Sequence, residues 1–235
     1  MVDRDDWARL LAGAPSERAA LPQRICDLCV SLLGVTGAGI SLSTATGNRG
    51  VVCATDDVAA RIEDLQVMLG EGPCVDAVGT GGPVLVPDLD RPDDVAVGRW
   101  PAFMEGAGAA GVRAVFAFPL RIGAIGLGAI DLSRTSPGDL DAEQLAGALI
   151  AADAAALALL DLDPAGDGFA EDYAARSTYH LQVHQATGMV QAQLDVTTDA
   201  AFATLRARAF ASGRQLVDVA TDVVERRLRF TTEDR

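Results

Sequence analysis

Residues 16–162 combine hydrophobic patterns typical of helices with patterns typical of strands. Apolar positions recur every three or four residues in 16–34, 58–69 and 142–162, and more weakly in 100–110, which predicts four helices. Short apolar runs bounded by turn residues predict strands at 39–43, 51–55, 84–86, 112–120 and 124–132. Turn signals at 46–50 and 121–123 indicate two hairpins. Helices flanking a mainly antiparallel sheet indicate an α+β domain.

Capping residues define where several of these helices begin and end. Ser16 is a suitable N-cap for the first helix, and Gly34 ends it. Asp139 or Asp141 is expected to cap the long helix that follows. In the helix at 58–69, the face expected to be buried carries Ile62, Leu65 and Leu69.

After residue 162 only helical patterns remain. The segment 163–168 holds two Gly and one Pro, which is typical of a linker or hinge. Three helices are expected at 177–194, 199–212 and 216–230, with Thr197 or Thr198 capping the second and Gly213 ending it. The chain is therefore divided into an α+β domain at 16–162, a linker at 163–177 and a small all-α three-helix bundle at 178–230. A bundle of about 55 residues has a core of marginal size, so we expect it to lean on a partner.

The long helix at 142–162 also carries a heptad-like spacing. Two explanations stay open: a seam between two copies of the chain, or a helix that packs against its own sheet. Two heptads are fewer than the three or four that identify a coiled coil. The positions concerned are Leu145, Leu149, Ala152, Ala156 and Leu159.

Composition and charge exclude several classes of protein. Hydrophobic residues make up 49% of the 235 residues and charged residues 22%, which excludes a disordered chain. The net charge is −14, and there are 19 Arg and no Lys. Residues 179–235 carry seven Arg and seven acidic residues, so all of the net charge lies before them. Only this neutral C-terminal segment is expected to approach a polyanion such as a nucleic acid.

The sequence predicts a cytoplasmic protein without a membrane span. The most apolar long segment is 144–160, and Asp153 in its middle would cost about 3 kcal/mol on insertion into a bilayer. The first residues lack the positive charge and apolar run of a signal peptide. Four cysteines in a chain of this length do not form a disulfide framework.

Cysteine and histidine spacings give little support for a metal site. Cys26 and Cys29 lie three residues apart on a predicted helix without a second pair of ligands, which favours buried core thiols over zinc ligands. His180 and His184 share a helix face, but Leu181 stands where a zinc protease motif has Glu. We therefore expect no metal and no cofactor.

The segment Gly70-Glu71-Gly72-Pro73-Cys74-Val75-Asp76-Ala77 is the densest cluster of small residues. A loop that opens a helix can bind an anion or lower the pKa of Cys74, but a structural turn is the favoured interpretation. No Ser-His-Asp set, carboxylate pair or phosphate-binding loop is evident, and residues 1–179 contain no histidine. We therefore expect the protein not to be an enzyme.

The C-terminal helices hold the candidate nucleic-acid contacts. Gly188 lies inside a helical pattern, where a glycine costs about 1 kcal/mol relative to alanine, so we expect another helix or a ligand to approach it closely. Arg206 and Arg208 lie among small residues of the next helix, and Arg226, Arg227 and Arg229 follow at the end of the third. Such arginines suit contacts with phosphates and base edges, although arginines at a helix C-terminus also complement the helix dipole.

These residues resemble a known family. The stretch HQATGMVQAQLDVTTDAAFATLRARAFASGRQLVDVATDVV is similar to the ANTAR domain, an RNA-binding module of transcription antiterminators. The similarity includes Ala186, Gly188, Ala201, Leu205-Arg206, Ala209 and Val219-Ala220. Thr187 departs from the family, which often has Lys before the Gly, and removes an electrostatic contact. Residues 16–162 resemble a GAF sensor domain in the order of their elements and in the GEGPCVDA segment.

The resemblance implies a function and a set of contacts. ANTAR domains bind nascent RNA with two stem-loops, each with a hexanucleotide loop, and so favour antitermination. A pair of hairpins implies a homodimer, and the GAF domain implies control by a small-molecule ligand that the sequence does not identify. The residues expected to contact RNA are Gln185, Ala186, Thr187, Gly188, Met189, Arg206, Arg208, Ala209 and Arg214.

Two other functions remain as alternatives. One is a DNA-binding helix-turn-helix regulator, which needs a recognition helix with a basic face. The third helix carries Asp218, Asp222 and Glu225 before its arginines, which disfavours this role. The other is a redox sensor that uses the cysteines of the first domain.

Overall fold

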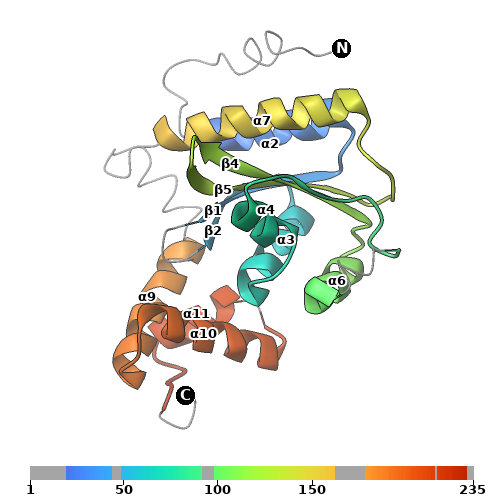
Figure 1. Ribbon diagram of the computed structural model, residues 1–235. Coiled ribbons are helices and arrows are strands. Elements are labelled where there is room, and N and C mark those ends of the chain that lie inside the picture. The colour runs from blue at the N-terminus through green and yellow to red at the C-terminus, as the bar shows by residue number, and fades with distance from the viewer. Residues whose placement is uncertain (1–19, 44–48, 92–97, 162–177, 215, 232–235) are drawn as a thin grey trace. The chain divides into compact units, whose positions relative to one another are not determined.

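The structure is a computed structural model, and it describes residues 20–43, 49–91, 98–161, 178–214 and 216–231. The described residues form two units (Figure 1). The first contains a sheet and helices, and the second contains helices alone. Ser16, the predicted linker at 163–177 and most of the turn at 46–50 lie outside the described residues.

The first unit is built on a five-stranded sheet in the order β2-β1-β5-β4-β3, in which all neighbouring strands are antiparallel. The predicted α+β fold with a sheet flanked by helices is confirmed. Strand ends differ from the predictions by at most two residues. The strands are β1 (Gly37–Ser43), β2 (Arg49–Ala54), β3 (Val84–Val86), β4 (Ala114–Ile122) and β5 (Ile125–Arg134).

Helices cover both faces of this sheet. In Figure 1, α2 (Leu21–Leu33) and α7 (Ala142–Asp161) lie side by side on one face. Two further helices, α3 (Asp57–Leu69) and α4 (Pro73–Thr80), pack on the other. A fifth helix, α6 (Pro101–Ala109), packs against α3.

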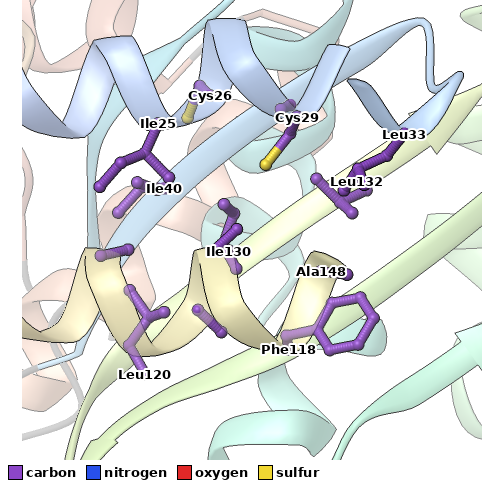
Figure 2. Packing of buried hydrophobic residues seen from close by; sticks show 14 of the residues in the cluster. Ile25, Cys26, Cys29, Leu33, Ile40, Phe118, Leu120, Ile130, Leu132 and Ala148 are labelled. Carbon is purple, nitrogen blue, oxygen red and sulfur yellow. The ribbon is translucent and has the colours of Figure 1, made fainter. Parts of the chain in front are cut away.

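A cluster of apolar side chains fills the core under α2 and α7. Alternate residues of β4 and β5 point toward these helices because side chains along a strand change face at every residue. Figure 2 shows Ile25, Cys26, Cys29 and Leu33 of α2 above Ile40, Phe118, Leu120, Ile130 and Leu132 of the sheet. Cys26 and Cys29 are part of this core.

Most of the heptad-like seam of α7 packs inside the domain, and Leu149 is its exposed position. Ala152 and Ala156 are only 6% and 1% exposed, because they pack against the core beneath α7. Of the two explanations left open, packing within the domain therefore applies to these positions. The exposed leucines of α7 are Leu149, Leu157 and Leu160.

The helix α7 is also the one helix among the described residues that is long and apolar enough to cross a membrane. Core helices of globular domains often have the same length and apolar composition. Here α7 is such a core helix, because it packs against α2 and the sheet.

Helix ends in the first unit follow local chemistry. The helix α2 begins at Leu21, with Pro22 in its first turn, and ends at Gly34 in the left-handed conformation. The guanidinium of Arg134 donates to the carbonyls of Leu33 and Gly34 at that end. At α7 the cap is Asp141 and not Asp139, because Oδ1 of Asp141 accepts from the backbone N–H groups of Glu143 and Gln144.

The buried face of α3 differs from the predicted one. Ile62 is buried, but Leu65 and Leu69 are only partly buried, against the cluster that includes α6. Glu63 and Gln66 are fully buried instead. Hydrophobic periodicity identified the face that packs toward α6 and missed the buried Glu63 and Gln66, because it assigns polar residues to the solvent side.

The second unit is a bundle of three helices, α9 (Thr178–Leu194), α10 (Thr198–Ser212) and α11 (Leu216–Val224). Thr197 caps α10, since its side chain accepts from the N–H of Ala200, and Gly213 ends it. The predicted three-helix architecture is confirmed. Its core contains Val183, Ala186, Val190, Leu194, Ala201, Phe202, Leu205, Ala209, Leu216, Val219, Ala220 and Val223.

The third helix ends six residues before its predicted end. Arg226 has φ +61°, a left-handed conformation that is uncommon for a residue other than glycine. The N–H of Arg227 then donates back to the carbonyl of Asp222 at 2.7 Å. The chain turns and buries Phe230, whose N–H donates to Oε1 of Gln193 at 2.8 Å. The apolar pattern continues past the helix because this short segment also packs on the bundle.

Candidate functional site

The residues predicted on α9 separate into a buried and an exposed set. Gln185 and Gly188 are exposed, and Met189 is partly exposed. Ala186 and Thr187 are buried. The hydroxyl of Thr187 donates to the carbonyl of Val183 at 2.7 Å, one turn earlier in the helix. In this structure Ala186 and Thr187 present no surface to a ligand, contrary to their assignment as contacts.

Gly188 faces open space. A Cβ at this position would have no atom of the described residues within 4 Å. No helix of the described part of the bundle approaches it closely, so that half of the expectation is wrong. The remaining explanation is a partner that is not part of this chain's bundle.

The second helix of the bundle carries its arginines on the outside. Arg206 is partly exposed, and its guanidinium lies over the ring of Phe202 at 5.7 Å from the ring centre. Stacking on an aromatic ring orients a guanidinium and leaves its edge for hydrogen bonds. Arg208 is exposed. Ala209 is fully buried, so it supports the helix and does not contact a ligand here.

Three arginines surround a hollow between the end of α10 and α11. The hollow has a volume of about 330 Å³. Its lining includes Arg208, Arg214, Arg227 and one acidic residue, Asp222. We call it the arginine-lined hollow. Arg208 and Arg214 were predicted as RNA contacts, and the structure places Arg227, which was not predicted, beside them.

Asp222 holds two of these arginines in place. Its carboxylate accepts from Arg214 at 2.8 Å and from Arg227 at 2.7 Å. The hydrogen bond from Arg227, and then that from Arg214, lowers the pKa of Asp222 below its usual 3.8. Arg227 also pairs with Glu225. The arginines are therefore oriented side chains with exposed edges, which suit the binding of an anion such as phosphate.

Phe210 is a further candidate that the sequence analysis missed. Its side chain is 59% exposed on α10. It lies four residues after Arg206, so the two side chains are neighbours on the helix surface. An exposed aromatic ring beside arginines is a common platform for stacking an unpaired base. The sequence could have indicated this candidate, because Phe210 is an aromatic residue that follows Arg206 and Arg208 closely in the same predicted helix.

The segment 70–77 in the first unit acts as a structural turn. Gly70 ends α3 and Pro73 lies in the first turn of α4. The carboxylate of Glu71 accepts from the N–H groups of Ala102 and Phe103, and so caps α6. The N–H of Cys74 donates to Oε1 of Gln66 at 2.7 Å. This N–H is therefore not available to bind an anion at the start of α4.

The cysteines of the first unit are buried. Sγ of Cys26 lies 3.6 Å from Sγ of Cys53, a neighbour that only the packing of α2 on β2 reveals. Burial raises the pKa of Cys29 to about 12. The hydrogen bond with Cys53, and after it burial, raises the pKa of Cys26 well above 9.0. These thiols are protonated at neutral pH, which disfavours reactive thiolates. The side chains of His180 and His184 lie outside the described residues.

Comparisons with known proteins agree with this two-part architecture. The GAF domain family matches residues 16–160, and the ANTAR domain family matches residues 172–224. The comparison with curated proteins gave no match. Among solved structures, a GAF domain/HD domain protein from Geobacter sulfurreducens is similar in fold. It has 12% identity and a TM-score of 0.51, and the match covers 66% of this chain and 100% of that chain.

Another similar structure is a domain of a two-component sensor histidine kinase protein from Sinorhizobium meliloti 1021. It has 17% identity and a TM-score of 0.48, and the match covers 70% of this chain and 99% of that chain. Both family matches concern regulatory domains, not catalytic ones. The chain belongs to the GAF domain family, and its GAF domain is followed by an ANTAR domain.

Proposed function

We propose that this protein is an RNA-binding transcription antitermination regulator. Its ANTAR domain binds paired stem-loops in nascent RNA in the cytoplasm, and its GAF domain controls that binding. The observation that carries this proposal is a pair of outward-facing side chains on α10, Arg206 over the ring of Phe202 and the exposed Phe210 one turn later, together with the arginine-lined hollow at the end of that helix. Guanidinium groups bind the phosphate backbone, and an exposed ring stacks an unpaired loop base, so the domain offers both parts of RNA recognition.

The predicted contact residues take different parts in this proposal. Arg208 and Arg214 bind phosphates from the rim of the hollow, and Arg227 joins them. Arg206, oriented by Phe202, binds a base edge or a phosphate. Gln185, Gly188 and Met189 provide accessible surface on α9. Ala186, Thr187 and Ala209 are buried and hold the helices in place.

The paired stem-loops require two such surfaces. Each copy of the chain carries one ANTAR domain, with the arginine-lined hollow at the end of α10 and the exposed Phe210 on the surface of that helix. A two-fold homodimer presents the same surface twice, one for each hairpin. The GAF domain shifts the protein between inactive and active states when a small molecule binds the two states with different affinity.

The test is a titration of the full-length protein with RNA. The RNA has two hairpins with hexanucleotide loops, and the controls have one hairpin or scrambled loops. We expect Arg206→Ala to weaken binding of the two-hairpin RNA by about 1–3 kcal/mol. Arg61→Ala is the matched control, because Arg61 is an exposed arginine of the GAF domain.

Two results would contradict the proposal. Equal affinity for scrambled loops would exclude specific recognition of the hairpins. Unchanged affinity of a folded Arg206→Ala variant would place the contact on another surface. Light scattering with and without the RNA tests the homodimer, which a monomer mass in both conditions would exclude.

A further inference from the structure

Three side chains with metal-ligating groups meet inside the GAF domain. They are Glu63 on α3, Cys74 on α4 and Asp131 on β5. One ligand atom from each lies within 4.8 Å of the other two. The three residues are 1%, 2% and 3% exposed. We call this set the buried triad.

Backbone geometry explains how the triad forms. Along β5, Ile130 and Leu132 belong to the apolar core under α2 and α7, so Asp131 between them points to the opposite face. On the neighbouring strand β1, a Cβ at Gly39 would lie 2.8 Å from Cγ and Oε1 of Glu63. Gly39 therefore leaves the space that the side chain of Glu63 fills.

One carboxylate oxygen of the triad has no partner. Oε2 of Glu63 is fully buried and has no hydrogen-bond partner among the described residues. A buried carboxylate oxygen without a partner is costly, and a metal ion would satisfy it.

Neighbouring polar side chains hold the other two members of the triad. Nε2 of Gln66 donates to Oδ2 of Asp131 at 2.6 Å, and Oε1 of Gln66 accepts from the N–H of Cys74. Oγ of Ser41 lies 3.3 Å from Sγ of Cys74. Hydrogen bonds of this kind orient ligands in protein metal sites.

We propose that Glu63, Cys74 and Asp131 bind one divalent first-row transition metal ion, of which Zn²⁺ is the simplest example. A thiolate disfavours Mg²⁺ and Ca²⁺, and two carboxylates disfavour Cu⁺. Bonds of about 2.0–2.3 Å bring the ligand atoms of a tetrahedral ion to about 3–4 Å from one another, so the triad needs only a small contraction. Cys74 loses its proton to solvent on binding, as does the carboxyl pair of Glu63 and Asp131. Three protein ligands leave a fourth position for water or a small molecule.

This site differs from the sequence-based expectation of no metal. The three ligands come one each from three separate elements, so no spacing motif marks them. The RNA-binding proposal does not depend on the site, because every residue of the triad lies in the first unit.

The test uses Co²⁺ as the probe with untagged full-length protein from which metals have been removed. Absorption spectroscopy is expected to show one Co²⁺ per chain, with a thiolate-to-cobalt charge-transfer band that Zn²⁺ abolishes. Cys74→Ala should lose the band. Cys29→Ala should keep it, because Cys29 is equally buried but lies in the opposite core.

Two near-isosteric variants guard against loss of folding. Glu63→Gln and Asp131→Asn each keep the size of the side chain and are expected to lower Co²⁺ affinity by at least about tenfold. Circular dichroism establishes that each variant is folded. Absence of the band in the wild-type protein would overturn the proposal, as would an unchanged band in Cys74→Ala. Unchanged Co²⁺ affinity in both folded near-isosteric variants would overturn it too.

Discussion

The two domains of this protein place their charged groups in opposite ways. The GAF domain buries two carboxylates, Glu63 and Asp131, beneath α3 and α4. The ANTAR domain keeps its arginines at the surface, and a partly exposed Asp222 orients two of them. A charge inside a protein needs a neutralising partner, whereas an oriented charge at the surface is available to a ligand from outside. The GAF domain is therefore suited to binding a small ligand or ion in its interior, and the ANTAR domain is suited to binding an anion at its surface.

The two domains also differ in how their cores are built. The GAF domain has a sheet with an apolar face packed under two helices. The ANTAR core consists of side chains from three short helices and of Phe230, which the chain buries after α11 ends. A small core has less stability to lose, so we expect the ANTAR domain to be the more sensitive to substitution.

The largest expected effects come from removing one large side chain from each core. Phe118→Ala should destabilise the GAF domain by about 3–5 kcal/mol, and Leu205→Ala should destabilise the ANTAR domain by about 2–5 kcal/mol. Both residues are fully buried. Denaturant unfolding measures both effects, with the fluorescence of the buried Trp100 reporting on the GAF domain.

The same pair of variants tests whether the two cores are independent. Leu205→Ala should abolish RNA binding, because the arginines depend on a folded bundle. Phe118→Ala should retain it below the unfolding transition. Loss of RNA binding in Phe118→Ala while the ANTAR helices remain folded would show that the two cores are coupled.

Phe210→Ala tests the exposed surface of the ANTAR domain. We expect RNA affinity to fall by about 1–3 kcal/mol, because a stacked base loses its platform. Folding should be little affected, since the ring is mostly exposed. Fluorescence anisotropy with the two-hairpin RNA measures the change. Leu157→Ala, which removes an exposed side chain of the GAF domain, is the control, and an equal loss in both variants would contradict base stacking.

Gly188→Ala separates folding from binding. Alanine should stabilise α9 by about 0.5–1 kcal/mol, because it favours helix and meets no atom of the described residues within 4 Å. RNA affinity should fall if the ligand approaches the helix at this glycine. Thermal unfolding and RNA titration on the same sample measure both quantities. A variant that is more stable and binds RNA equally well would exclude Gly188 from the contact surface.

The smallest effect is expected at Asp222, because its ion pairs are close to solvent. Its pKa is lowered in the folded protein, so its contribution to stability is present above pH 3.8 and is lost as the pH falls below that value. Asp222→Asn should remove this acid-dependent loss. It should also free Arg214 for phosphate, while Arg227 keeps its pair with Glu225, and RNA binding should become slightly tighter and more dependent on salt. Unfolding measured across the acidic range and RNA affinity measured at several salt concentrations test the two effects.

The sequence alone determined the order and type of most elements. Gly34 and Gly213 end helices where predicted, and Thr197 was one of the two caps proposed for α10. These signals are local, because a cap or a left-handed glycine acts within one turn of the chain. Their locality is the reason that they can be read without a structure.

Only the tertiary structure decided which side chains meet. The strand order brings β5 beside β1, and this order places Asp131 near Glu63 and Cys74 from two different helices. Likewise, the turn at Arg226 brings Arg227 back to Asp222 and Arg214. Hydrophobic periodicity did not mark Glu63 as buried, and it placed Leu228 in a helix, because it contains no information about contacts distant in the chain. Both the buried triad and the arginine-lined hollow arise from such contacts.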